Sequence, residues 1–100
     1  MKIKYRKATL ADIPNMQNLI APEVQQGIIL ERSADEMATN IRSYILAYQE
    51  NELVGFNALH VHTFDLAEIR SLIVKEALRG LKIGENLVKE SLNEATLLGV

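Results

Sequence analysis

Polar and apolar positions alternate with two different periods in the first third of the chain. Residues 3–8 alternate weakly, in the manner of a β-strand. Thr9 and Asp12 follow, spaced like the two ends of a helix capping box. An apolar stripe behind them recurs every three to four residues and predicts a helix, in which Pro14 is tolerated near the start. The stripe consists of Leu10, Ile13, Met16, Leu19 and Ile20.

A second helix start lies near residue 33. Ser33 and Glu36 have the spacing of a capping box. The helix that they begin is expected to use Met37, Ile41 and Tyr44 as its apolar face. The residues between the two helices form a connector.

The second half of the chain alternates strand-like and helix-like patterns. Three runs rich in β-branched and aromatic residues predict strands, the first two joined as a hairpin by a polar turn. A stripe with helical spacing then extends from Gly84 to Leu98, and Gly99 suits the helix C-cap. The order β-α-α-β-β-β-α predicts one α/β domain over residues 1–100. The predicted strands cover residues 45–48, 53–62 and 67–74.

Composition narrows the class of protein. The 100 residues, 48% hydrophobic and 24% charged, suit one small globular domain. The absence of cysteine excludes disulfides, thiolate nucleophiles and Cys-based metal sites. A net charge of −2 gives no general attraction to nucleic acid. Neither a membrane span nor an apolar signal segment is visible, so we expect a cytoplasmic protein without membrane contact.

A short loop joins the last predicted strand to the long helix. It consists of Arg79, Gly80, Leu81, Lys82, Ile83 and Gly84. A helix N-terminus exposes unpaired N–H groups and partial positive charge, and glycines allow the backbone to approach a bulky anion closely. The loop can therefore hold a phosphate. The alternative is an ordinary turn that needs glycine for its geometry and carries two solvated cations, and the spacing alone slightly favours this alternative.

Two stretches resemble a known family. "RGLKIG" after "EIRSLIV" resembles the pyrophosphate signature Arg/Gln-x-x-Gly-x-Gly/Ala of the GNAT acetyltransferase superfamily. Arg79 and Gly84 match its ends, whereas Lys82 stands where the family usually has its first glycine. Upstream, "QQGIILERSADEM" at residues 25–37 resembles the acetyltransferase domain of bacterial N-acetylglutamate synthases.

The resemblance implies a fold and a cofactor site. The expected fold is a mixed sheet with helices on both faces, in which the C-terminal part of the family fold is missing. Acetyl-CoA is the implied cosubstrate, with its pantetheine arm beside Leu72, Ile73 and Val74 and its pyrophosphate on the loop 79–84. The backbone N–H of Leu72 or Ile73 is expected to polarise the thioester carbonyl.

The resemblance also implies residues for the chemistry. Glu68 is the expected base, because family members often carry a glutamate here, and partial desolvation inside its strand is expected to favour a proton acceptor. Its alternative role is an ion pair with Arg70. Arg32 is the expected grip on the substrate carboxylate, with Arg70 as a second candidate. Arg32 is otherwise a solvated residue before a helix cap.

No metal site is predicted. His60 and His62 are spaced to share one face of a strand, which permits a metal pair. A third ligand at an informative spacing does not accompany them. Polar residues that face solvent or the cleft are the preferred interpretation of both histidines.

The resulting functional hypothesis is acetyl-CoA-dependent N-acetylation of an amino acid, with glutamate as the first candidate and arginine biosynthesis as the implied pathway. Alternatives are a GNAT enzyme for another amine or a protein N-terminus, a non-catalytic acyl-CoA-binding module, and an interaction domain whose loop binds nothing. The missing second half leaves the edge of the strand 67–74 unpaired. The chain is therefore expected to be a fragment of a longer protein, and a homodimer that covers the edge is another alternative.

Overall fold

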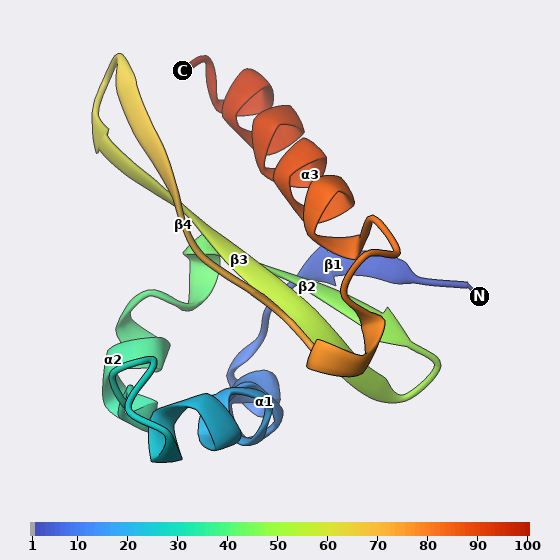
Figure 1. Ribbon diagram of the computed structural model, residues 1–100. Coiled ribbons are helices and arrows are strands. Elements are labelled where there is room, and N and C mark those ends of the chain that lie inside the picture. Colours follow the sequence, from blue (N-terminus) through green and yellow to red (C-terminus); the bar gives the residue numbers. More distant parts are fainter. Residues whose placement is uncertain (1) are drawn as a thin grey trace.

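A four-stranded sheet organises the protein (Figure 1). The computed structural model describes residues 2–100. Neighbouring strands follow the order β1-β2-β3-β4, and the predicted order β-α-α-β-β-β-α is confirmed. The main elements are β1 (Lys4–Lys7), α1 (Ile13–Gln25), α2 (Ala34–Thr39), β2 (Tyr44–Gln49), β3 (Glu52–Thr63), β4 (Leu66–Val74) and α3 (Ile83–Leu98). Three short 3-10 turns are η1 (Leu10–Asp12), η2 (Ile41–Ser43) and η3 (Glu76–Leu78).

All strand pairs among the described residues are antiparallel, whereas a mixed sheet was expected. β2, β3 and β4 are joined by tight turns, so each strand reverses the direction of the one before it. The α1–α2 connection also returns the chain antiparallel to β1. A parallel neighbour needs a crossover connection to a later strand, and α3 is the last element in the described part of the chain.

Helices cover both faces of the sheet, as predicted (Figure 1). Strand side chains point alternately to the two faces, so the adjacent residues Leu46 and Ala47 belong to different cores. α1 and α2 cover one face, where the buried cluster includes Met16, Ile20, Met37, Leu46 and Phe56. α3 covers the other face, where the buried cluster consists of Ile45, Ala47, Val54, Ile83 and Leu87.

The first helical segment is held by Asp12, and the predicted capping box is confirmed. The backbone N–H and the hydroxyl of Thr9 donate to Asp12 Oδ2 at 2.8 and 3.0 Å. Arg6 donates to both carboxylate oxygens at 2.9 and 2.7 Å. The Arg6 guanidinium therefore holds the pKa of the Asp12 carboxyl well below its usual range. Leu10 lies in η1 rather than on the stripe of α1 and is 60% exposed.

The second helix is shorter than predicted. Ser33 Oγ accepts a hydrogen bond from the Glu36 N–H at 3.1 Å, which confirms the N-cap. The helix ends at Thr39, and Asn40 Nδ2 donates a hydrogen bond to the Glu36 carbonyl oxygen at 3.0 Å. Tyr44 begins β2 and is buried there, so its placement on a helix face was wrong. Pairing with β3 and core burial outweigh the helical spacing, and β-branched and aromatic residues favour strands.

Candidate active site

The loop before α3 encloses a small hollow at the N-terminus of that helix. The N–H groups of the first helical turn have no acceptors within the helix, and the 16-residue helix carries partial positive charge at this end. The hollow therefore suits an anion. Its volume is about 360 Å³, and it is lined by Val74, Leu78, Arg79, Gly80, Lys82, Ile83, Gly84 and Glu85.

The backbone of this loop is left-handed at two positions. Gly80 has φ 87°, and Lys82, the N-cap of α3, has φ 69°. The left-handed region costs a non-glycine residue roughly 1–2 kcal/mol. This geometry explains why a glycine at position 82 suits the family signature. At Gly84, by contrast, an added Cβ would lie 3.5 Å from Val74 Cγ2, an ordinary contact that leaves room for alanine.

The Arg79 side chain is engaged with the protein itself. Its Nε donates to the Val74 carbonyl at 3.1 Å, and its Nη2 lies 2.7 Å from Glu23 Oε1 near the end of α1. These contacts join the loop to α1 across the molecule. Arg79 therefore shapes the loop, while the backbone amides and the exposed Lys82 face solvent as the groups that an anion can meet.

β4 bulges near its C-terminal end, before η3 and the loop. Two residues of β4, Ser71 and Leu72, oppose the single β3 residue Asn57, and Ser71 has φ 60°. A bulge bends the strand and leaves part of the ladder unpaired. Leu72 is 48% exposed, Ile73 packs towards α1, and Val74 packs towards α3. The backbone of Leu72 to Val74 therefore lies at a sheet edge on which no described strand pairs.

A polar cluster lies farther along the same two strands. His60 pairs directly with Glu68 across β3 and β4, so His60, His62, Glu68 and Arg70 share one face of the sheet. His62 Nε2 lies 3.0 Å from Glu68 Oε1, and Arg70 Nε lies 3.8 Å from the same oxygen. The Glu68 side chain is 56% exposed, so the expected desolvation is not observed: the face beyond the core is open.

Arg32 approaches this cluster from the connection between α1 and α2. Gln17 Nε2 on α1 donates to the Arg32 carbonyl at 3.2 Å and fixes the connection. Burial lowers the pKa of His60, and the positive charges of Arg70 and Arg32 lower it further. The structure thus places Arg70 beside Glu68 and brings the charge of Arg32 close enough to His60 to act on the pKa of that histidine. Hereafter "polar cluster" means His60, His62, Glu68, Arg70 and Arg32.

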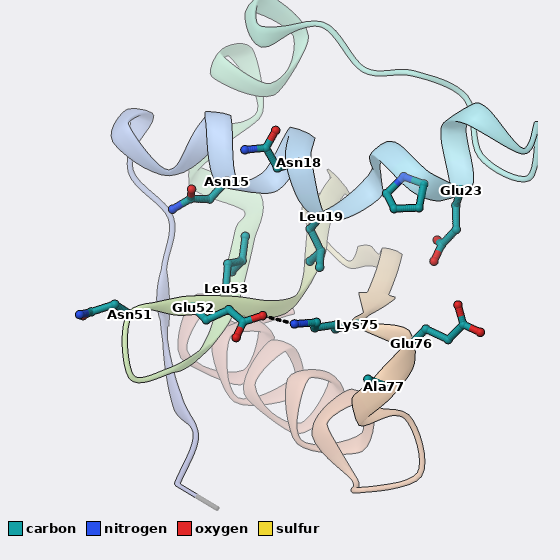
Figure 2. Close-up of a pocket in the computed structure, with 11 residues that line it drawn as sticks. Asn15, Asn18, Leu19, Glu23, Asn51, Glu52, Leu53, Lys75, Glu76 and Ala77 are labelled. Carbon is teal, nitrogen blue, oxygen red and sulfur yellow. Dashed lines mark hydrogen bonds and ion pairs between the residues drawn. The ribbon is translucent and has the colours of Figure 1, made fainter.

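A larger hollow of about 850 Å³ lies elsewhere, between α1, the β2–β3 turn and η3 (Figure 2). Asn15, Asn18 and Leu19 line it from α1, and Glu52 forms an ion pair with Lys75 across its opening. Glu23 and Glu76 also line it, which makes its charge unfavourable for a diphosphate. The sequence contained no motif for this hollow, because its lining comes from three separate segments.

The contact of His62 with Glu68 was not anticipated from the sequence. The histidines were assigned to a strand face, and this placement is correct. The missing information was the register, since only the pairing of His60 with Glu68 brings His62 within reach of the carboxylate. Residues 2–100 contain no group of three or more His, Cys, Asp or Glu side chains arranged to hold a metal ion. No helix in this described part has the length and apolarity to span a bilayer.

Comparison with known proteins tests the resemblance. The model of the Acetyltransferase (GNAT) family matches residues 11–100. The chain belongs to the GNAT acetyltransferase family.

Two curated GNAT relatives indicate the level of similarity. An uncharacterised N-acetyltransferase of Chlorobaculum tepidum is 35% identical over 86 residues, which are 86% of this chain and 56% of the relative. An amino-acid acetyltransferase of Shewanella oneidensis is 30% identical over 97 residues, which are 96% of this chain and 22% of the relative. This chain thus spans about half of the first relative and about a fifth of the second.

A solved structure confirms the GNAT fold. N-acetylglutamate synthase from Neisseria gonorrhoeae, in complex with coenzyme A and N-acetyl-glutamate, matches with a TM-score of 0.90 and 29% identity. The match covers 100% of this chain and 24% of that chain. The three helices and the antiparallel strands described above therefore belong to an acetyltransferase domain fold.

Proposed function

We propose that this GNAT domain transfers an acetyl group from acetyl-CoA to the amino group of an amino acid, with L-glutamate as the first candidate. One observation carries the proposal: a helix N-terminal loop suited to a diphosphate follows the edge strand β4, and the same strand carries Glu68 beside Arg70. The GNAT relatives with amino-acid substrates support it. The corresponding pathway step is the first acetylation in arginine biosynthesis.

The loop 79–84 is the proposed pyrophosphate site. The residues that begin α3 line the hollow, and the exposed Lys82 adds a positive charge. The bulge at Ser71 and Leu72 lies between this loop and Glu68, so a pantetheine arm along β4 can place a thioester near the carboxylate. A backbone N–H of Leu72 or Ile73 polarises the thioester carbonyl in this arrangement.

Glu68 acts as the base in this proposal. It removes one proton from the acceptor ammonium group, directly or through water, and so frees the nitrogen lone pair for attack. The nitrogen attacks the thioester carbonyl, and the new N–C bond replaces the C–S bond. The second nitrogen proton, which becomes acidic once the N–C bond has formed, passes to the leaving sulfur, so that coenzyme A leaves as the thiol. Because the chain contains no cysteine to carry an acetyl group, transfer proceeds directly between the two bound substrates.

Arg32 and Arg70 hold the acceptor in this proposal. A planar guanidinium binds a carboxylate through two parallel hydrogen bonds, and glutamate has two carboxylates. The two arginines come from different elements, so they can approach one acceptor from different sides. A diamine or another acceptor without a carboxylate gains nothing from either arginine.

A thiol-release assay with acetyl-CoA and a panel of amines tests the function. We expect glutamate to be acetylated with a higher kcat/KM than aspartate, glutamine or spermidine. Release with a different amine and none with glutamate would remove the glutamate assignment but keep the transferase. Absence of release with every amine would refute the transferase itself.

A second candidate function is a non-catalytic acyl-CoA-binding module. The strained Lys82 at the usual glycine position and the exposure of Glu68 favour it. Calorimetry separates the candidates, because a module binds coenzyme A while the thiol-release assay stays blank. A titration without heat at high coenzyme A concentration would remove both candidates.

A further inference from the structure

His62 contacts the proposed base Glu68, although His62 belongs neither to the family signature nor to the proposed acceptor site. We propose that His62 is a positioning residue for acetyl transfer, which holds one oxygen of Glu68 so that the other remains available to the acceptor ammonium, and which weakens the base when protonated. This inference rests on the proposed function. It concerns the proton path of that site rather than the binding of either substrate.

The geometry assigns the direction of the hydrogen bond. His62 Nε2 lies 3.0 Å from Glu68 Oε1. An ionised carboxylate only accepts hydrogen bonds, so Nε2 must carry the hydrogen. Arg70 Nε lies 3.8 Å from the same Oε1. Both basic neighbours therefore approach one oxygen, and Oε2 is left for the proton of the acceptor.

The exposure of the pair argues against a role in folding. The side chains of His62 and Glu68 are 43% and 56% exposed. Pairs as exposed as this one contribute little to stability. A loss of activity without a loss of stability is therefore the result that a positioning role predicts and a structural role does not.

Protonation of His62 should make the base weaker. A second proton turns the imidazole into a cation beside the carboxylate, and a neighbouring positive charge favours the ionised form of Glu68. The charged and titratable groups near His62 are His60 on β3, Glu68 and Arg70 on β4, and Asp65 in the turn, while Arg32 from the α1–α2 connection acts on the neighbouring His60. The rate of the original protein should therefore fall more steeply on the acid side than the rate of a variant without the imidazole.

Two substitutions at one position separate hydrogen bonding from titration. His62→Ala removes both, whereas His62→Gln keeps an amide N–H that can reach Oε1 but cannot titrate. We expect His62→Ala to lower kcat on the order of tenfold, a part of the ~10²–10⁴ that general bases contribute, with coenzyme A affinity and Tm unchanged. His62→Gln should restore most of kcat but flatten the acid limb of log kcat against pH.

Thr63→Ala is the matched control, because Thr63 follows on the same strand and donates only to Asp65 at 2.9 Å. It should retain the rate and pH profile of the original protein. If the original protein is active and His62→Ala has the same kcat and the same acid limb, the inference is overturned while the proposed function stands. A fall in Tm or in coenzyme A affinity that parallels the fall in kcat would overturn it as well, in favour of a structural role. An original protein that acetylates no amine would overturn the proposed function and this inference together.

Discussion

The cofactor loop and the polar cluster are built in opposite ways. The loop is one contiguous stretch, residues 79–84, and its chemistry comes mainly from backbone amides and left-handed φ angles. The polar cluster is assembled from β3, β4 and the α1–α2 connection, and its chemistry comes from side chains. A site made of backbone tolerates changes of side chain, whereas a site made of side chains depends on each residue and on the packing that brings the elements together.

Replacement of the proposed base should cause the largest change in activity, and it should leave coenzyme A binding intact. Glu68→Gln keeps the shape of the side chain but cannot accept the acceptor proton at neutral pH, so kcat should fall by about 10²–10⁴. Coenzyme A affinity measured by calorimetry should change little, because the loop is untouched. Glu90→Gln, on the exposed face of α3 and outside the hollow, is the control. A substantial loss of coenzyme A binding in Glu68→Gln would show that the two regions are not separate.

The second largest effect is expected on the KM for the acceptor when Arg32 is replaced. Arg32→Gln removes a charged partner for a substrate carboxylate, which is worth about 1.5–3 kcal/mol and hence about 10–100-fold in the acceptor KM. The KM for acetyl-CoA should stay within about threefold, because Arg32 lies outside the loop hollow. Arg42→Gln, on an exposed 3-10 turn, is the control. An equal rise in both KM values would argue for a general structural role of Arg32.

Two glycine substitutions compare the packing of β3 beneath β4 and α3 with the packing of the loop 79–84. A Cβ at Gly55 would lie 2.9 Å from the Ile73 carbonyl oxygen and 3.2 Å from Leu87 Cδ1. Gly55→Ala must therefore move β4 or α3, and we expect a loss of about 1–3 kcal/mol in the free energy of unfolding. Gly84→Ala is the matched control, since its Cβ makes ordinary contacts. Equal melting curves for the two variants would contradict this account of the packing.

The smallest expected effect concerns the strained lysine of the loop. Lys82→Gly removes the left-handed strain of ~1–2 kcal/mol but adds the flexibility of glycine, so a net gain of about 0.5–1 kcal/mol in unfolding free energy is expected. Thermal denaturation measures it. Calorimetry on the same variant shows how much of coenzyme A binding belongs to the ammonium group. A lower Tm in Lys82→Gly would mean that the lysine side chain stabilises the loop by contacts of its own.

Local patterns accounted for much of the fold. The capping box at Thr9, the N-cap at Ser33 and the C-cap at Gly99 depend on neighbours in the chain, and the structure has all three, although the Ser33 cap lacks the return bond of a capping box. The predicted α2 was too long because Tyr44 belongs to β2, which pairs with β3 beyond the next turn. Local spacing cannot weigh such a distant pairing against a helical turn.

The candidate site likewise has a part that local sequence predicts and a part that depends on distant segments. Residues 79–84 were recognisable because a helix N-terminus and its preceding loop are adjacent in the chain. The contact of His62 with Glu68 depends on strand register, and a shift of one residue would turn these side chains to opposite faces. The use of Arg79 to bind Glu23 also depends on a partner far along the chain.

The amino-acid sequence by itself determined the order of elements, the caps, the glycine-containing loop before α3 and the family to which the chain belongs. The caps and the loop arise from interactions within one or two turns of the chain, so short-range physics specifies them, whereas the family was recognised from the resemblance of two short motifs. The tertiary structure alone decided the antiparallel register, the bulge opposite Asn57 and the meeting of Arg32, His62, Glu68 and Arg70. Those features require distant segments to pack against a common core, where the burial of the whole sheet rather than any local preference selects the arrangement.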